Sequence, residues 1–317
     1  MPFRALTAAR PTTMHTRPVR LQIYRTSVPM RSFEHAAASR SVAEAVVARL
    51  ELSDGAAGWG ETLPREYVTG ESIDSVVADL SDFLWPALRD AWGAAAPPDT
   101  LDALDRLLPA ERDGRCVNAA RCCLELAVLA AVGPAELAAV RGRPIAARVT
   151  GVLGSADPTR TRKRLRLMRL FGLRDFKLKL GLGAEADAAN LRVVQRRLGP
   201  ALAAGRCTLR VDANGAWSAD ETPDRIAELR ARGVLAVEQP VSAPAAELAE
   251  LARRCSLPLI ADESLLTPAD AETLAAHAEH VWWNLRISKN GGLVRTLRLA
   301  ELAARRGVTV VLGCMVG

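Results

Sequence analysis

The sequence lacks any run of about 18 uncharged apolar residues, the length that a membrane-spanning helix requires. Its 6 cysteines form no C-x-x-C pair and no metal-finger spacing, a usage typical of reduced, mostly buried thiols in a cytoplasmic protein. Aromatic residues make up only 4%, and no basic block is interleaved with them. We therefore expect a soluble, cytoplasmic protein with neither a membrane nor a nucleic acid as its partner.

Lysine is also scarce, because only four of the 42 Lys and Arg residues are lysines, at positions 163, 177, 179 and 289. Arginine supplies nearly all of the positive charge, so a lysine kept against this bias indicates a position where arginine cannot substitute. Lysine can lose its proton when it is desolvated, whereas arginine effectively cannot. Lys163 lies in the charged stretch TRKRLRLMRL and is interpreted as a solvated side chain. The other three lysines are candidates for proton transfer.

From about residue 147 the sequence repeats one unit: a short aliphatic or β-branched run, a turn, and an amphipathic segment. Strands that alternate with helices pair in parallel, and seven such units favour a (β/α) barrel over an open sheet. The first strand is followed by GSADPT, which lacks the glycine-rich phosphate turn of an open doubly wound fold. The predicted strands span 147–153, 175–180, 208–212, 235–238, 258–262, 282–288 and 308–313.

Residues 1–140 predict a separate α+β capping domain, with strands at 19–28, 42–53 and 57–62 followed by helices at about 72–92, 99–108 and 115–131. The arginine-rich start faintly resembles a transit peptide, although a ragged leader or an early start codon is the favoured interpretation. Residues 141–317 predict the barrel, which lacks its last strand. The sequence is then a fragment, or the last strand is replaced in another way.

Ionisable residues lie at the carboxyl ends of successive predicted strands, where barrel enzymes place their catalytic groups. Lys177 and Lys179 are two residues apart on one strand, so both face the barrel interior. A structural alternative is that these lysines only pair with acids around the barrel mouth. The remaining groups at the strand ends are Asp212, Asn214, Glu238, Asp262, Glu263 and Lys289.

Asp212, Glu238 and Asp262 end three successive strands, and none of the four histidines lies at a strand end. Each acid alone could cap the helix that follows it. Together they supply an all-oxygen ligand set, which favours Mg²⁺ or Mn²⁺ over Zn²⁺. We therefore expect a metal site at this rim.

At these residues the sequence resembles the enolase superfamily, and within it the muconate-lactonizing subgroup of the muconate-lactonizing enzyme and mandelate racemase family. The resemblance covers nearly the whole chain, since WGETLPREYVTGE (59–71) is similar to the capping-domain loop of that family. The matching stretches in the barrel are FKLKLG (176–181), VDANGAW (211–217), VEQP (237–240), ADES (261–264), NLRISKNGG (284–292) and GCM (313–315).

The resemblance implies a (β/α)₇β barrel under an α+β cap, and a role for each matched position. Asp212, Glu238 and Asp262 would bind the metal, with Asn214 and Glu263 as supporting groups beside them. Lys179 and Lys289 would stand on opposite faces of the substrate's α-carbon. Lys177 would lie beside the substrate carboxylate and help Lys179 to release its proton.

Removal of a proton α to a carboxylate, through an enediolate, needs a cation that neutralises the second negative charge. A lysine base also needs a pKa lowered from about 10.4 toward roughly 7 to 8, which burial and a neighbouring cation provide. If both lysines transfer protons, we expect a racemase or epimerase of an amino-acid or dipeptide-like substrate. If only one acts as a base, an o-succinylbenzoate synthase or muconate cycloisomerase is expected instead. An alternative of another class is a truncated, non-catalytic paralogue.

Substrate specificity is expected from the loops of the cap and from the end of the chain. The candidates for contacts with a small-molecule carboxylate substrate are Arg31, His35, Arg65, Tyr67, Cys314 and Met315. The eighth-strand residues and the acid that commonly follows GCM in the family are absent from the sequence. A homo-oligomer is expected.

Overall fold

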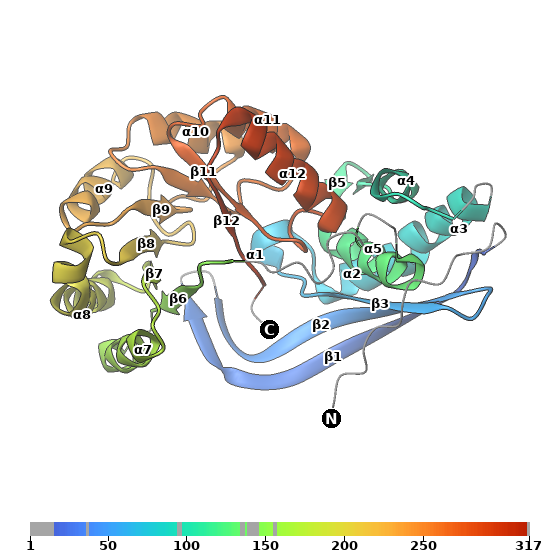
Figure 1. Ribbon diagram of the computed structural model, residues 1–317, viewed down its shortest axis with the longest axis horizontal. Helices are drawn as coiled ribbons and strands as arrows, with labels where there is room; N and C mark the ends of the chain where they lie inside the picture. The colour runs from blue at the N-terminus through green and yellow to red at the C-terminus, as the bar shows by residue number, and fades with distance from the viewer. Residues whose placement is uncertain are drawn as a thin grey trace.

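The computed structural model describes residues 16–35, 38–93, 97–133, 137, 146–154 and 157–315, with side chains left out for residues 31–40. It contains an N-terminal part, from β1 to α5, and a barrel part, from β6 to β12. Figure 1 shows the barrel sheet curling at one end of the molecule, and the helices of the N-terminal part at the other end.

The N-terminal part is built on an antiparallel sheet of order β1-β2-β3, in which β1 and β2 form a long ribbon (Figure 1). Helices follow the sheet, and a small hairpin of β4 and β5 precedes the last of them. The elements are β1 (Pro18–His35), β2 (Ala38–Leu52), β3 (Ala57–Thr62), α1 (Glu66–Thr69), α2 (Ile73–Asp79), the π-helical turn η1 (Leu80–Leu84), α3 (Trp85–Gly93), α4 (Leu101–Leu107), β4 (Glu111–Arg112), β5 (Arg115–Cys116) and α5 (Asn118–Val132).

Helix α5 packs closely on this sheet because two positions of β3 carry no side chain. The strand alternates exposed and buried residues, as expected when one of its faces is covered. A Cβ atom at Gly58 would overlap the carbonyl oxygen of Ala127, and one at Gly60 would overlap that of Cys123. Val46 and Leu50 of β2 are fully buried in the apolar cluster that includes α5. Close packing therefore fixes the position of α5 on the sheet.

The barrel part contains a parallel sheet of seven strands in the order β12-β11-β10-β9-β8-β7-β6. Each strand except β12 is followed by a helix, and the helices cover the outer side of the curled sheet (Figure 1). The elements are β6 (Thr150–Leu153), α7 (Pro158–Leu170), β7 (Asp175–Lys179), α8 (Ala184–Ala203), β8 (Thr208–Asp212), α9 (Thr222–Ala231), β9 (Ala236–Glu238), α10 (Ala245–Arg253), β10 (Leu259–Ala261), α11 (Pro268–Ala275), β11 (Val281–Leu285), α12 (Leu293–Arg306) and β12 (Val310–Leu312).

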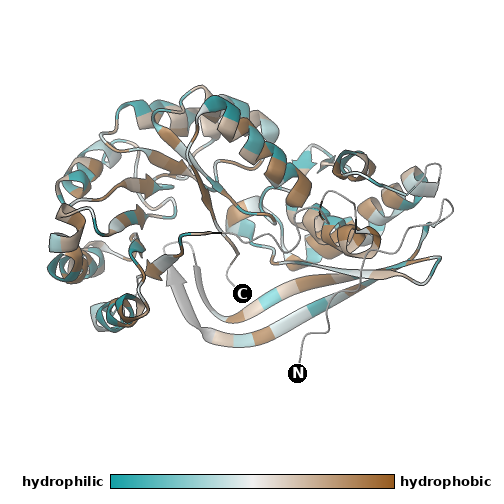
Figure 2. Ribbon diagram, in the orientation of Figure 1, coloured by the Kyte–Doolittle hydropathy of each residue, from teal (hydrophilic) through white to brown (hydrophobic). Residues whose placement is uncertain are grey.

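The strand side chains that face the helices form the apolar core of the barrel part. Phe176 and Leu178 of β7 are fully buried in this cluster, as are Val211 of β8 and Val237 of β9. Figure 2 shows hydrophobic and hydrophilic residues mixed along the strands and helices of this part. Because side chains alternate along a strand, Lys177 and Lys179 lie on the opposite, inner face.

The predicted fold class is confirmed. Each of the seven predicted barrel strands overlaps one strand of the parallel sheet, and the three predicted N-terminal strands overlap β1, β2 and β3. Strands β6 and β12 form the two edges of the barrel sheet within the described residues. The domain limits at residues 140 and 141 remain a prediction.

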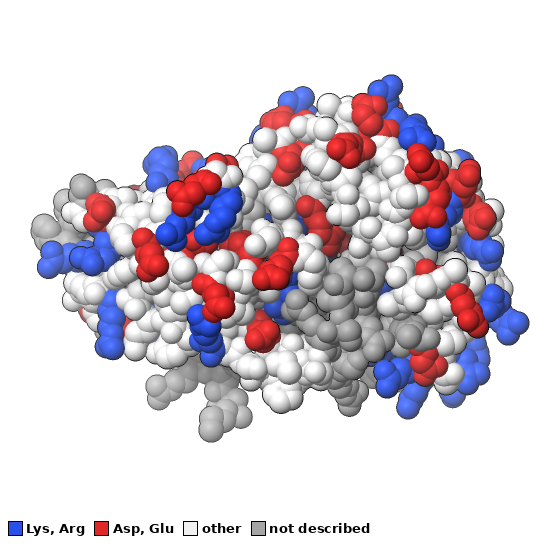
Figure 3. All heavy atoms as spheres, turned by 180° about the vertical axis from the view of Figure 1, so that it is seen from behind, with Lys and Arg blue, Asp and Glu red and all other residues white. Residues whose placement is uncertain are grey.

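Charged side chains of both signs are interspersed over the face shown in Figure 3. In the described part of the chain, no helix combines the length and the apolar character needed to cross a bilayer.

Candidate active site

The carboxyl ends of β7, β8 and β9 align three of the predicted site residues side by side. Lys179 pairs in register with Asp212, and Asp212 pairs with Glu238. Asp262 follows directly after β10, whose Ile260 is the register partner of Glu238. The three carboxylates are at most 1% exposed. The parallel sheet therefore brings the predicted metal ligands into one buried row.

Lys177 and Lys179 reach this row from β7. The amine of Lys177 lies 2.9 and 3.0 Å from the two carboxylate oxygens of Glu238, and 3.3 Å from Oδ2 of Asp212. The amine of Lys179 lies 3.5 Å from Oδ2 of Asp212 and donates a hydrogen bond of 2.9 Å to Oδ1 of Asn214. Lys177 therefore bridges two carboxylates, and Lys179 lies at the outer end of the row.

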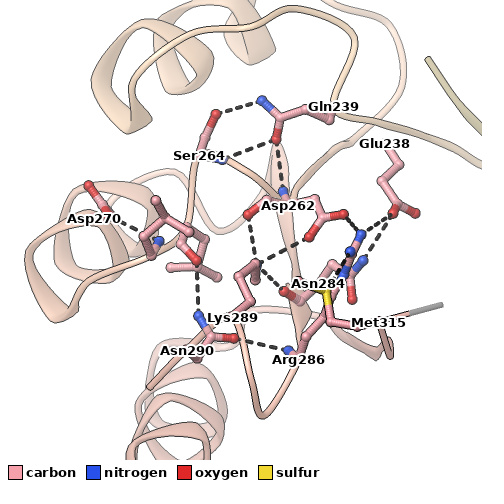
Figure 4. A network of polar contacts seen from close by, with 12 residues as sticks. Glu238, Gln239, Asp262, Ser264, Asp270, Asn284, Arg286, Lys289, Asn290 and Met315 are labelled. Carbon is pink, nitrogen blue, oxygen red and sulfur yellow. Dashed lines mark hydrogen bonds and ion pairs between the residues drawn. The ribbon is translucent and has the colours of Figure 1, made fainter. Parts of the chain in front are cut away.

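Lys289 reaches the other end of the row from the turn between β11 and α12 (Figure 4). Its amine donates hydrogen bonds of 2.7 Å to the backbone carbonyls of Asp262 and Asn284, and lies 3.2 Å from Oδ1 of Asp262. The side chain is fully buried. The structure thus places the two predicted bases at opposite ends of one carboxylate row.

Arg286 is a site residue that the sequence interpretation missed. Its guanidinium forms an ion pair with Asp262 and lies 3.9 Å from Oε1 of Glu238 (Figure 4). Nη1 also lies 3.6 Å from the sulfur of Met315. A signal for it exists in the sequence, because the polar residues Asn284 and Arg286 alternate with Leu285 and Ile287 at the end of a predicted strand.

The donor chemistry of the row suits a hard divalent cation. Four buried carboxylate oxygens accept no hydrogen bond from the described residues: Asp212 Oδ2, Asp262 Oδ1 and Oδ2, and Glu263 Oε2. Carboxylate oxygens are the ligands that Mg²⁺ and Mn²⁺ prefer. As the side chains stand, however, no three Asp, Glu, His or Cys residues in the described part of the chain are grouped closely enough to share one ion. Lys177 and Arg286 instead neutralise the carboxylates.

The pKa values of the three lysines shift in different directions: those of Lys179 and Lys289 are lowered, and that of Lys177 is raised. Burial is the largest effect on each of them and lowers the pKa. The pKa of Lys179 ends below the ordinary value, because Lys177 adds to the effect of burial and Asp212 only partly opposes it. Burial and the Arg286 charge hold the pKa of Lys289 well below its usual range. The pKa of Lys177 is raised, because Glu238 and Asp212 outweigh burial.

The pKa values of Asp212 and Glu263 also shift in opposite directions. Burial alone would raise the pKa of Asp212, but the charges of Lys177, Lys179 and Arg286 lower it to about 2. Burial and the neighbouring Asp212 charge raise the pKa of Glu263 to about 7. Asp212 is therefore ionised at neutral pH, whereas Glu263 is close to half protonated.

The row opens into a cavity of about 450 Å³. Both Lys177 and Lys179 line it, together with the cations Arg65, Arg148, Arg210 and Arg286. Lys289 is fully buried and is not among the described residues that line the cavity, whereas its charged neighbours Arg286 and Glu263 are. Of the two predicted bases, Lys179 is thus open to the cavity and Lys289 is covered.

The predicted substrate contacts are only partly brought together. Tyr67, Cys314 and Met315 line the cavity, as does Arg65, whose buried side chain donates to the backbone carbonyls of Pro64 and Glu44 at 2.6 and 3.2 Å. Arg31 and His35 lie on β1, but their side chains fall outside the described residues. Four of the six candidates therefore surround the same space.

Further polar residues that the sequence interpretation missed hold the carboxylates in place. Gln239, at a positive φ of 35°, accepts hydrogen bonds from the backbone nitrogens of Asp262 and Ser264 (Figure 4). Asn284 donates a hydrogen bond of 2.9 Å to Glu238. The predicted supporting residue Asn214, at a φ of 47°, donates from its backbone nitrogen to Oδ1 of Asp212 at 3.0 Å.

Comparison with known proteins relates this chain to enzymes of one family. A family model described as enolase C-terminal domain-like matches residues 160–317. The L-Lys-D/L-Arg epimerase of Methylococcus capsulatus is 32% identical over 286 residues, which cover 88% of this chain and 77% of that protein.

Two solved structures are similar over nearly the whole chain. The muconate lactonizing enzyme from Pseudomonas fluorescens, complexed with muconolactone, has a TM-score of 0.80 and 26% identity, covering 95% of this chain and 81% of its own. The dipeptide epimerase from Methylococcus capsulatus, complexed with Mg and L-Arg-D-Lys, has a TM-score of 0.73 and 27% identity, covering 94% of this chain and 83% of its own.

Proposed function

Because this chain belongs to the muconate-lactonizing enzyme and mandelate racemase family of the enolase superfamily, we propose that it is a divalent-metal-dependent isomerase that removes the proton α to a substrate carboxylate. Its substrate would enter the cavity between residues of the barrel rim and of the N-terminal part, with residues 1–140 acting as the cap. The specific reaction that we favour is racemisation or epimerisation of an amino-acid or dipeptide-like carboxylate.

The observation that carries this proposal is the placement of two amines at the ends of one buried carboxylate row. Lys179 contacts Asp212 at one end, and Lys289 contacts Asp262 at the other. Burial lowers the pKa values of both amines, which favours the unprotonated form that a general base needs. A carbon atom bound between them can lose a proton to one amine and receive a proton from the other.

Asp212, Glu238 and Asp262 would hold the metal, with Asn214 and Glu263 supporting them. Mg²⁺ is the favoured ion, since a dipeptide epimerase of similar structure is complexed with Mg, and the same oxygen donors would accept Mn²⁺. When bound, the ion supplies positive charge that offsets the charge developing on the substrate carboxylate. Arg286 is paired with Asp262, so its guanidinium would compete with the ion for this carboxylate.

The protein side chains then divide the proton transfers. Lys179, which lines the cavity, takes the α-proton from one face of the substrate. Lys289 returns a proton to the other face, and this inverts the configuration. Lys177 keeps its proton, because Glu238 and Asp212 raise its pKa, and its charge favours the neutral form of Lys179.

The cavity favours a substrate of modest size with more than one anionic or polar group. Its volume of about 450 Å³ suits an amino-acid derivative or a dipeptide. Arg65, Arg148 and Arg210 line it besides Arg286, and Arg210 has no carboxylate within ion-pair distance among the described residues. The similar epimerase of Methylococcus capsulatus supports a dipeptide.

The test is deuterium uptake at the α-carbon from ²H₂O, measured by mass spectrometry with a library of dipeptides and N-acyl amino acids and added Mg²⁺. We expect uptake with wild-type protein and none with the Lys179→Ala, Lys289→Ala double variant. Uptake that survives in the double variant would falsify the assigned bases. A well-folded wild-type protein without uptake from any member would favour the non-catalytic paralogue.

A second candidate is a lyase or cycloisomerase of the o-succinylbenzoate synthase or muconate cycloisomerase type. The enclosed position of Lys289 favours it, since only Lys179 of the two bases reaches the cavity. In that case Lys179→Ala abolishes turnover, and Lys289→Ala leaves deuterium exchange at the α-carbon intact for every substrate that exchanges. Epimerisation predicts instead that each single variant loses exchange with one epimer.

A further inference from the structure

The turn that carries Lys289 contacts the start of helix α5, although α5 belongs to the N-terminal part. Asn118, Arg121 and Glu125 lie at helical spacings of three and four, so they share one face of α5. All three are at most 1% exposed. Because Lys289 lies outside any strand, its backbone depends on such contacts for its position.

Each of the three side chains holds a different point of the segment that begins at Lys289. The side-chain amide of Asn118 donates hydrogen bonds to the backbone carbonyl of Lys289 at 2.8 Å and of Leu266 at 3.0 Å. Arg121 donates to the carbonyl of Gly291. Glu125 accepts a hydrogen bond of 3.1 Å from the backbone nitrogen of Val294. One face of α5 therefore follows the chain from the turn into the start of helix α12.

The fit between the two segments leaves little room. Gly291 and Gly292 adopt left-handed φ values of +81° and +118°, which favour glycine. A Cβ atom at Gly292 would lie 2.5 Å from the carboxylate of Glu125, and one at Gly291 would lie 3.0 Å from Oδ1 of Asn118. Val294 packs into the same apolar cluster as α5. Close packing and hydrogen bonds thus act on the turn together.

The helix end that grips the turn is itself fixed. The carboxylate of Glu71 accepts hydrogen bonds from the backbone nitrogens of Ala119 at 2.8 Å and Ala120 at 3.1 Å, which caps the start of α5. Arg121 also forms an ion pair with Asp105 and donates to the carbonyl of Leu108. The contact with the Lys289 turn is therefore made by a rigid element.

Lys179 is placed in a different way, because it belongs to β7, in register with β8. We infer that Asn118 is a positioning residue for Lys289 alone, acting through the Lys289 carbonyl, so that the N-terminal part sets the geometry of one of the two bases. This inference rests on the proposed function for its catalytic consequence. Its structural consequence, the fixing of the turn, can be tested without activity.

The experiment compares Asn118→Ala and the milder Asn118→Ser, which keeps a shorter donor, with Val128→Ala as a matched control. Val128 is fully buried in the same helix, and its aliphatic side chain cannot donate a hydrogen bond to the turn. Deuterium uptake is measured separately for the two epimers of a substrate, and Lys179→Ala and Lys289→Ala identify which epimer depends on which base. A displacement of a catalytic group by about 1 Å costs up to roughly a hundredfold in rate.

We expect Asn118→Ala to lower the Lys289-dependent deuterium uptake by roughly tenfold or more, because the Lys289 turn loses one or two hydrogen bonds. The Lys179-dependent uptake should stay within about twofold of wild type. Val128→Ala is expected to change both uptakes by the same factor. An equal loss for both epimers in the Asn118 variants, or no loss for either, would overturn the inference.

Backbone hydrogen exchange of metal-free protein gives the readout that does not need turnover. The amides of Asn290 and Gly292 are hydrogen-bonded within the turn, each at 2.9 Å. We expect the peptide that covers residues 286–292 to exchange about tenfold faster in Asn118→Ala, faster by a smaller factor in Asn118→Ser, and at the wild-type rate in Val128→Ala. Unchanged exchange of that peptide would overturn the inference even if no substrate is found, whereas faster exchange without any substrate turnover would count against the proposed function alone.

Discussion

The unusual state of Glu263 predicts that the metal-free protein loses stability as the pH rises. Its pKa is about 7 in the folded protein against an ordinary value of 4.5, because burial and Asp212 disfavour the charged form. The folded state therefore binds more protons than the unfolded state between these two values. Stability contributed by protonated Glu263 is present below about pH 4.5 and is lost as the pH rises through about 7.

The magnitude follows from the size of this shift. About 1.4 kcal/mol per pH unit, over the interval from 4.5 to about 7, amounts to roughly 3 kcal/mol in the free energy of unfolding. Glu263→Gln resembles the protonated side chain at every pH. The variant and the wild type should therefore unfold with similar free energies near pH 4.5 and differ by roughly 3 kcal/mol above pH 7, with the variant more stable.

The assay is urea unfolding of both proteins in EDTA over this pH range. Other titrating groups, such as Glu71 and Glu125, are common to both proteins, so the difference between them reports on Glu263. Added Mg²⁺ should shrink the difference, since a cation bound at Asp212 favours the ionised carboxylate. A difference that stays constant from acid to neutral pH would refute the assignment of a protonated, buried Glu263.

Three further perturbations test other parts of the structure. Arg286→Met removes the cation that neutralises Asp262 and Glu238. Calorimetry should therefore show that this variant binds Mg²⁺ at least about tenfold more tightly than the wild type or the control Arg210→Met. Equal affinities would contradict a competition between Arg286 and the ion. Lys177→Met removes the amine that bridges Asp212 and Glu238, and should cost about 3 to 5 kcal/mol of unfolding free energy in EDTA, but clearly less with Mg²⁺. Gly58→Ala should lower the free energy of unfolding in urea by at least about 1 to 3 kcal/mol, since the added methyl group overlaps α5. An unfolding midpoint equal to that of the wild type would show that α5 packs elsewhere.

The alternation along the strands makes the rim of the barrel predictable from the sequence. Phe176 and Leu178 alternate with Lys177 and Lys179, and this local pattern fixes which side chains face inward. Parallel strands end at the same edge of a sheet, so Asp212, Glu238 and Asp262 are expected to meet there. The scarcity of lysine, taken together with this pattern, indicates the candidates for proton transfer from the sequence alone.

The contacts between distant segments are not predictable in the same way. Asn118 and Lys289 are 171 positions apart, and no periodicity reports which helix end meets which turn. The alternation of Arg286 with apolar residues indicates that it faces inward, but its ion pair with Asp262 depends on the closeness of β10 and β11. Which of the two bases reaches the cavity also depends on packing, so the enclosure of Lys289 is visible only in three dimensions.

The most direct measurement is a crystal structure of the protein soaked in Mn²⁺, with the ion located by its anomalous scattering. We expect one strong peak bonded to the carboxylates of Asp212, Glu238 and Asp262, with the guanidinium of Arg286 moved away from Asp262. A saturating soak that yields no peak between these carboxylates, with Arg286 still paired to Asp262, would contradict the proposed metal site.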